Sequence, residues 1–135
     1  MLRKIMPVAA SFLLAGAAYG QQAGAPLQPS PVKREVISTI AVPNSNYQVI
    51  TAMLEVAPGF KAGRHLHPGI VSGHVLEGQF WIAIEGEPEK TLNPGEGLAI
   101  PLRAIHNEGA LGDKPMKAIV TYVVEKGQPL VQPVQ

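Results

Sequence analysis

Two histidines one residue apart, His65 and His67, are the side chains of this sequence best suited to chemistry. Alternate side chains of a β-strand lie on one face, so these imidazoles would lie about 6–7 Å apart on the same side of a strand. Two imidazoles at this spacing can turn toward one metal ion, to which histidine nitrogens bind at about 2.0–2.1 Å. His106 is the candidate third ligand. The alternative is that all three are ordinary core or surface histidines.

The segments around these histidines have the pattern of short strands separated by turns. No segment after residue 20 keeps a helical periodicity, and the 13 prolines and 14 glycines favour turns. About eight short strands predict an all-β sandwich or barrel. His106 is predicted to lie in a loop. The predicted strands, besides one at the His-x-His pair, are 35–42, 47–56, 71–76, 79–84, 90–92, 98–101 and 117–124.

Composition limits the classes of function. The chain has 135 residues, enough for one domain with one core. It has no cysteine, which excludes disulfides, thiolate metal ligands and a cysteine nucleophile. A net charge of +1 argues against a nucleic-acid partner.

The first twenty residues have the pattern of a signal peptide. Arg3 and Lys4 precede an apolar run from 5 to 18, and Ala18 and Gly20 are small residues at the positions that a signal peptidase recognises. Cleavage is therefore predicted before Gln21. The alternative is a membrane anchor, but the run is short for a span of about 20 residues. We expect a periplasmic or secreted protein that has no membrane attachment after cleavage.

The mature chain is divided into three parts. Residues 21–34 are rich in Pro, Gly and Gln, which predicts an extended arm. Residues 35–128 hold the predicted strands and form the barrel. Residues 129–135 form a C-terminal tail.

Two motifs contain the three histidines. The first has a glycine, a His-x-His pair and a closing glycine, and its residues are Gly59, His65, His67 and Gly78. The second has a glycine, a proline and a histidine, and its residues are Gly95, Pro101 and His106. Both motifs resemble those of the cupins, which are small jelly-roll barrels. The resemblance covers about residues 47–124 and implies a double-stranded β-helix of the jelly-roll type.

The resemblance also implies a metal site. His65, His67 and His106 match three of the usual ligands, and the implied cofactor is one divalent ion: Fe, Mn, Ni or Zn. The usual glutamate is replaced by Val71, which would leave the ion with its full +2 charge and make it a stronger Lewis acid. His74 could replace the glutamate only if a bulge at Gly73 turned it inward.

Other departures from the motifs concern the remaining polar positions. Arg103 occupies the place of a usual glycine, and Ala110 that of a usual asparagine. Glu77 and Glu96 are expected to be exposed at turns.

Four residues are candidates for the substrate pocket. Arg64 and Arg103 stand near ligand histidines and could bind an anionic substrate, although either could instead be a solvated surface arginine. Phe80 and Ile82 are expected to form an apolar wall inside the barrel, or plain core. Apolar residues on the opposite strand faces, such as Tyr47, predict a homodimer through a sheet.

Three functions are compatible with these features. The first is a metal-dependent, oxygenase-like enzyme acting on a small anionic or enol-type substrate. The second is a non-enzymatic protein that binds a metal or small ligand, and the third is a metal-dependent isomerase or hydrolase. One barrel supports many activities, so the fold alone does not choose among them.

Overall fold

The structure is a computed structural model that describes residues 29–135. The predicted signal peptide and residues 21–28 of the predicted arm lie outside the described residues. Within the described part of the chain, no helix is long and apolar enough to cross a membrane.

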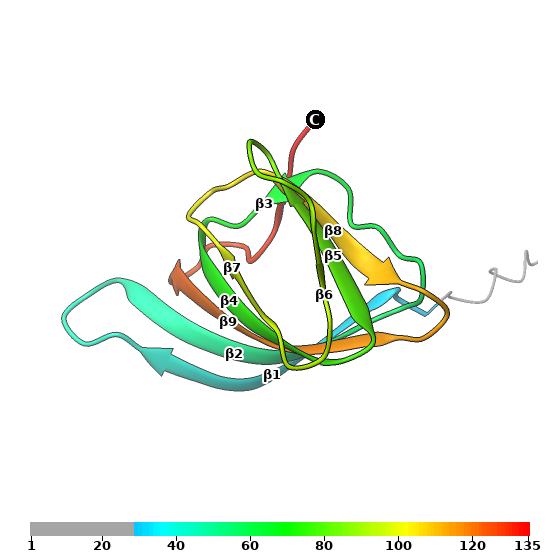
Figure 1. Cartoon of the computed structure of the whole chain (residues 1–135). Helices are drawn as coiled ribbons and strands as arrows, with labels where there is room; N and C mark the ends of the chain where they lie inside the picture. The colour runs from blue at the N-terminus through cyan, green and yellow to red at the C-terminus, as the bar shows by residue number, and fades with distance from the viewer. Residues whose placement is uncertain (1–28) are drawn as a thin grey trace, which may run out of the picture.

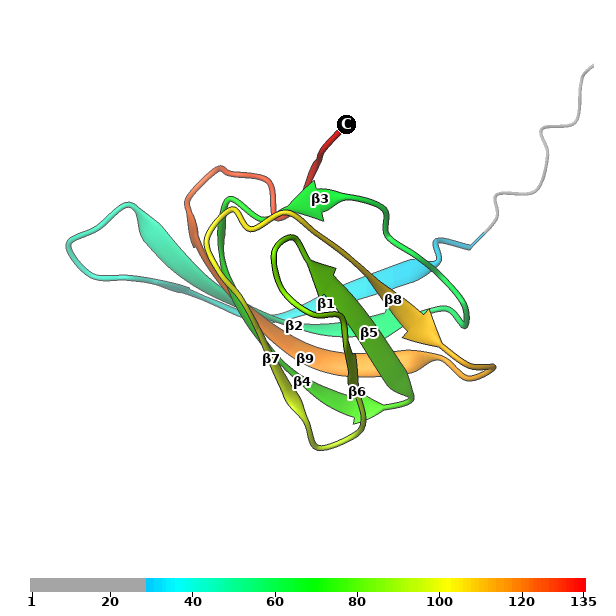
Figure 2. The same ribbon diagram turned by 45° about the horizontal axis from the view of Figure 1, so that its top comes forward.

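Two antiparallel five-stranded sheets face each other, which confirms the predicted all-β jelly-roll architecture (Figure 1). The first sheet has the order β1 (Val32–Ala41), β2 (Tyr47–Val56), β9 (Met116–Glu125), β4 (Gly69–Glu77) and β7 (Gly97–Ile100). The second has the order β10 (Gln132–Pro133), β3 (His65–Leu66), β8 (His106–Leu111), β5 (Gln79–Ile84) and β6 (Lys90–Leu92). The turned view shows the short strands of the second sheet lying across the long, curved strands of the first (Figure 2).

The core lies between the inner faces of the two sheets. Strands β2 and β9 pair without interruption from Tyr47–Glu125 to Val56–Met116, so their alternating side chains stay in register. Ala52 and Val120, which are paired, are both buried, whereas the next residues along each strand face outward. Apolar residues of the second sheet close the core from the other side, notably Phe80 and Ile82.

Two strands of the structure, β8 and β10, are absent from the sequence prediction. His106 was predicted to lie in a loop, and this is wrong: it is the first residue of β8. Its segment, His-Asn-Glu-Gly-Ala-Leu, is poor in β-branched and aromatic residues, so propensity gave no sign of a strand. Pairing with β5 along the whole length of β8 overrides that weak preference. Strand β10 in the tail was also missed, and it pairs with β3 beside the histidines.

The outer face of the first sheet carries exposed apolar side chains. Ile40, Tyr47 and Ile70 are 63%, 41% and 49% exposed. Ile40 and Val49 are ladder partners, as are Val49 and Val123, so the apolar side chains form a continuous strip across β1, β2 and β9.

Candidate metal centre

His65 and His106 face each other across two neighbouring strands. They are direct partners in the β3–β8 ladder, and their ring centroids are 4.2 Å apart. Both side chains are almost completely buried. The pairing explains how residues 41 positions apart in sequence reach one site: cross-strand partners share a face of the sheet.

His67 follows β3 directly and completes a group of three imidazoles. Its ring centroid lies 5.3 Å from that of His65 and 4.9 Å from that of His106. The backbone carbonyl of Leu130, in the segment that leads to β10, accepts a hydrogen bond of 2.6 Å from its Nδ1. The C-terminal segment therefore orients one of the three histidines.

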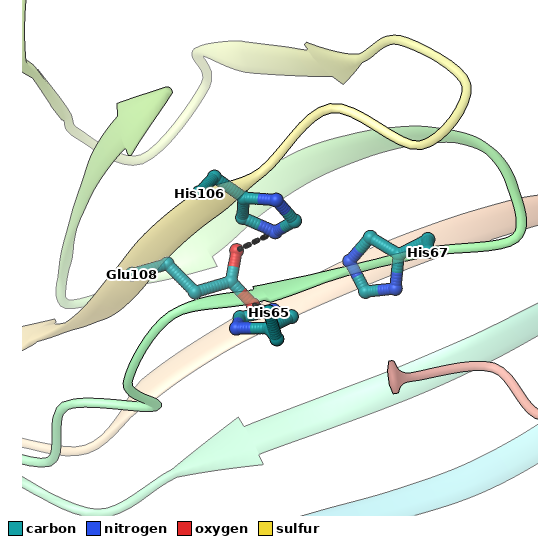
Figure 3. Close-up of side chains that lie close together, drawn as sticks. All are labelled: His65, His67, His106 and Glu108. Carbon is teal, nitrogen blue, oxygen red and sulfur yellow. Dashed lines mark ion pairs between the residues drawn. The ribbon is translucent and has the colours of Figure 1, made fainter. Parts of the chain in front are cut away.

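Glu108 adds a carboxylate that the sequence prediction did not include. It stands two positions after His106 on β8 and so lies on the same face of the strand (Figure 3). Its Oε1 lies 3.6 Å from Nε2 of His65, and its Oε2 lies 3.6 Å from Nε2 of His106. One ligand atom from each of the four side chains lies within 4.8 Å of the others.

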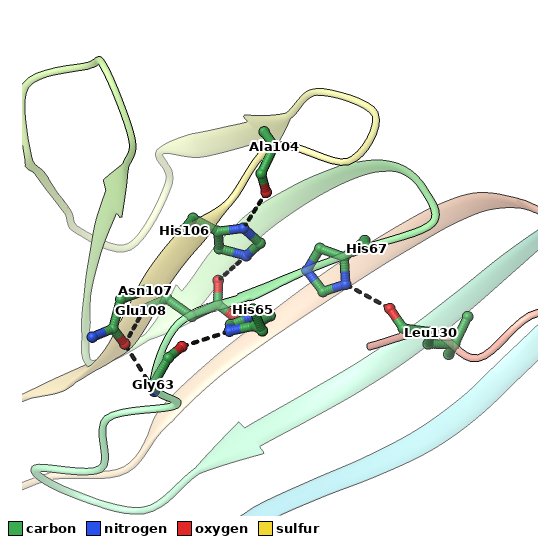
Figure 4. Close-up of polar contacts among 8 residues, drawn as sticks. All are labelled: Gly63, His65, His67, Ala104, His106, Asn107, Glu108 and Leu130. Carbon is green, nitrogen blue, oxygen red and sulfur yellow. Dashed lines mark hydrogen bonds and ion pairs between the residues drawn. The ribbon is translucent and has the colours of Figure 1, made fainter. Parts of the chain in front are cut away.

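Backbone carbonyls fix the tautomer of all three histidines (Figure 4). Nδ1 of His65 donates to Gly63 O at 2.8 Å, and Nδ1 of His106 donates to Ala104 O at 2.9 Å, as Nδ1 of His67 does to Leu130 O. A carbonyl oxygen only accepts, so each Nδ1 carries the proton and each neutral ring presents the lone pair of Nε2 to the interior.

A further hydrogen bond supports this arrangement from outside the cluster. The side-chain Oδ1 of Asn107 accepts from the backbone N–H of Gly63 at 2.9 Å, and so holds the residue whose carbonyl orients His65. Gly63 has a φ of +81°, a backbone conformation that glycine adopts without steric cost.

When all three rings are neutral, the site consists of acceptors without a matching donor. Nε2 of His106 is buried and has no hydrogen-bond partner. Leaving a buried polar atom unpaired costs about 1–3 kcal/mol. A cation shared among three imidazole lone pairs and a carboxylate would satisfy all of them, so these residues fit a divalent metal ion.

The electrostatics of the four groups also favour a cation. Burial opposes the charge of Glu108, but the hydrogen bond to His65 and the charges of the histidines outweigh it and lower the pKa of the carboxyl group. Burial lowers the pKa of His67 to about 4 and also lowers that of His106. Burial alone would lower the pKa of His65 as well, but contact with Glu108 and Gly63 raises it overall. At neutral pH the site holds a carboxylate and at least two neutral imidazoles.

A cavity of about 390 Å³ opens beside the cluster. His65, His67 and Glu108 line it, and most of its other walls are apolar, including Phe80 as predicted. Tyr122 also lines it, with its ring 5.7 Å from that of His67. Burial raises the pKa of Tyr122, so its hydroxyl remains protonated at neutral pH.

Three of the other candidate residues lie outside the cluster and its cavity. His74 is exposed and pairs with Ile119 on the outer face, so it does not join the cluster. Arg103 is exposed in the turn after β7 and does not line the cavity. Ile82 is buried but lines a separate space of about 130 Å³.

Arg64 lines the cavity, but its guanidinium already has partners. Nε and Nη2 donate to Glu85 Oε1 at 3.0 and 2.5 Å, and Nη1 donates to the backbone oxygen of Gln135 at 2.8 Å. An anionic substrate would have to compete with Glu85 for this side chain.

The site was predicted to lack a carboxylate, but Glu108 supplies one. Val71, at the position of the usual glutamate, is a buried core residue. The premise that only three imidazoles would surround the ion was wrong, because Glu108 on β8 reaches the same cluster. His106 and Glu108 are two positions apart, as His65 and His67 are. This spacing was the sequence signal that could have identified Glu108 as a fourth ligand candidate. Placing His106 in a loop concealed the shared face.

Solved structures with the same fold include several enzymes. DMSP lyase DddQ from Ruegeria pomeroyi is 19% identical with a TM-score of 0.63, over 82% of this chain and 57% of that one. The polyketide cyclase RemF from Streptomyces resistomycificus is 20% identical with a TM-score of 0.61, over 78% of this chain and 72% of that one. A recombinant oxalate oxidase in complex with glycolate is 19% identical with a TM-score of 0.59, over 83% and 59%. These likenesses show the fold.

No curated protein matches the sequence. The family model of the cupin domain matches residues 52–122, more than half of the chain, and this span contains all four residues of the cluster. The chain therefore belongs to the cupin domain family.

Proposed function

We propose that this chain is a metal-dependent, oxygenase-like enzyme that acts on a small anionic or enol-type substrate. The observation that carries the proposal is the convergence of four acceptor side chains, one with an unpaired buried nitrogen, beside an apolar cavity that three of them line. Histidines and a carboxylate together are suitable ligands for iron, manganese, nickel and zinc.

The number of protein ligands favours an ion that prefers six ligands. Catalytic zinc sites have three protein ligands and an open fourth position, whereas four protein ligands close a tetrahedral zinc site. Iron or manganese with the same four ligands would keep room for a substrate. When bound, such an ion would supply the redox chemistry that an oxygenase needs.

The residues of the chain have separate roles in this proposal. His65, His67 and His106 hold the ion through Nε2, while the carbonyls behind them keep the rings in place. Glu108 lowers the net charge of a divalent site to +1. Apolar walls, including Phe80, exclude water from the substrate.

Oxygen uptake tests this function directly. Purified, iron-loaded protein is given a panel of small hydroxy acids, keto acids and enols, and dioxygen consumption and product formation are measured together. We expect one substrate class to support oxygen uptake in the wild type and in Glu77→Gln, an exposed surface control. Glu108→Gln should lose the activity. Product formation without oxygen uptake would contradict the oxygenase proposal and favour an isomerase or hydrolase, and stoichiometric binding without turnover would favour a binding protein.

We also propose that the protein is a homodimer in an exported compartment. The exposed strip of Ile40, Tyr47 and Ile70 on the outer sheet face supports association through this sheet. Analytical ultracentrifugation should give the mass of a dimer for the wild type, and Ile40→Lys should shift it toward the monomer. A wild-type monomer at micromolar concentration would contradict this proposal.

A further inference from the structure

One cation on the inner face of the first sheet has no role in the site described so far. Arg34 lies on β1, opposite Leu54 in the β1–β2 ladder, and lines the same cavity as the histidines. Leu54 is a core residue, and direct ladder partners share a face, so Arg34 is on the inner side of the sheet. Arg34 is exposed, so it lies where the cavity meets solvent.

Tyr122 connects this arginine to the metal centre. The guanidinium carbon of Arg34 lies 5.7 Å from the centroid of the Tyr122 ring, and the same ring lies 5.7 Å from that of His67. Strand β2 separates β1 from β9, so the two side chains meet over the inner face of β2. The Tyr122 ring therefore lies 5.7 Å from both the guanidinium carbon of Arg34 and the ring of His67.

The positive charge of Arg34 is not neutralised within the cavity. No carboxylate within residues 29–135 forms a salt bridge with its guanidinium. Glu108 is the only acidic residue among the described residues that line the cavity, and it is engaged with His65 and His106. Arg64, the other arginine of the cavity wall, is held by Glu85. Arg34 is thus the available anion-binding group of this space.

We propose that Arg34 determines substrate specificity by binding an anionic group at one end of a substrate whose other end is held at the metal centre. The inference rests on the proposed metal-dependent function and narrows its substrate class to small molecules with two polar ends, such as hydroxy dicarboxylic acids. The planar guanidinium suits a carboxylate because it can donate two parallel hydrogen bonds. The apolar walls between the two ends accommodate a short carbon chain.

Binding measurements with matched probes test the proposal without turnover. Protein loaded with manganese, which leaves positions for a substrate beside four protein ligands, is titrated by calorimetry in the absence of dioxygen. The probes are 2-hydroxyglutarate and 2-hydroxyvalerate, and malate and 2-hydroxybutyrate. The two members of each pair share the metal-binding hydroxy acid and differ in the terminal carboxylate. Metal content is measured on every sample before titration.

The matched control variant is Lys33→Gln. Lys33 is the neighbouring residue on β1 and pairs with Glu55, so it lies on the opposite face and carries the same charge. Each of the two variants, Arg34→Gln and Lys33→Gln, therefore removes one positive charge, and the two charges lie on opposite faces of the same strand.

We expect the wild type and Lys33→Gln to bind one dicarboxylate at least about tenfold more tightly than its monocarboxylate partner, the value of one charge-assisted hydrogen bond. Arg34→Gln should lose this preference while its affinity for the monocarboxylate and its metal content stay unchanged. The role of Arg34 would be overturned if the wild type did not prefer the dicarboxylate, or if Arg34→Gln kept that preference. Either result would leave the proposed metal-dependent function standing. Protein that holds no metal would overturn the proposed function and this inference with it.

Discussion

Nε2 of His106 lies 3.6 Å from Oε2 of Glu108, and the two residues stand two positions apart on β8. The spacing puts both side chains on the inner face of the strand, and β3 brings His65 opposite His106. A strand of six residues thus supplies one imidazole and the only carboxylate of the cluster. The electrostatic balance of the site depends on this pair.

Glu108→Gln should lower the pKa of His65. Contact with Glu108, through a hydrogen bond and its charge, raises the pKa of His65 against the effect of burial. An uncharged amide removes the attraction, so burial should then dominate and the neutral ring should persist to lower pH. An NMR titration of the metal-free protein measures this. Glu77→Gln, at an exposed position, should leave the titration of His65 unchanged, and an unaltered pKa in Glu108→Gln would contradict the role assigned to the carboxylate.

Acid should destabilise the metal-free protein through His67. Burial lowers its pKa from 6.5 to about 4, so the unfolded chain binds a proton more readily than the folded one within this interval. The contribution of His67 to the free energy of unfolding is fully present above pH 6.5 and is lost as the pH falls toward 4. The loss amounts to about 3 kcal/mol for this one group. Urea unfolding of the wild type and of His67→Gln across this range checks the prediction.

The difference in unfolding free energy between these two proteins is the relevant quantity, since other carboxyl groups titrate in both. The wild type should lose more stability on acidification than His67→Gln does. Parallel pH profiles for the two proteins would show that His67 titrates normally in the folded state.

The alternation of apolar and polar residues along the sequence was sufficient to predict most of the strands. The predicted bounds of β2, β5 and β6 coincide with those of the structure, because each strand has a clear period of two or a sharp turn beside it. The convergence of His65, His67 and His106 also follows the prediction, since two motifs placed them near one another. Whether they bind metal stays a prediction.

Side-chain contacts between distant segments could not be read from local patterns. Glu108 was missed because β8 has a weak strand propensity, and Arg34 was assigned to an arm although β1 begins at Val32. The role of Leu130 in holding His67 depends on the pairing of β10 with β3. Each of these depends on tertiary pairing, which outweighs local preference.

Arg103→Gly should stabilise the protein. Arg103 has a φ of +57°, in the left-handed region that costs a residue with a Cβ about 1–2 kcal/mol. Glycine adopts this conformation without the clash, although it loses more entropy on folding, so a net gain of about 1 kcal/mol is expected. Chemical unfolding should give Arg103→Gly a higher free energy of unfolding than the wild type and than Arg103→Ala, which keeps the Cβ. A glycine variant no more stable than the alanine variant would contradict this explanation.

The exported protein should begin at Gln21. The basic residues, the apolar run and the small residues at 18 and 20 predict cleavage at this point. N-terminal sequencing of protein recovered from the periplasm or medium after expression of the full chain measures the cut directly. Retention of Met1 in a membrane fraction would favour the anchor instead.

Metal content by mass spectrometry tests the central claim most directly. The mature protein is purified without an affinity tag, together with His106→Ala and the control His74→Ala, which changes an exposed histidine outside the cluster. The account predicts about one equivalent of a divalent transition metal in the wild type and in His74→Ala, and its loss in His106→Ala. A wild type without metal even after reconstitution, or a His106→Ala variant that keeps it, would contradict the account.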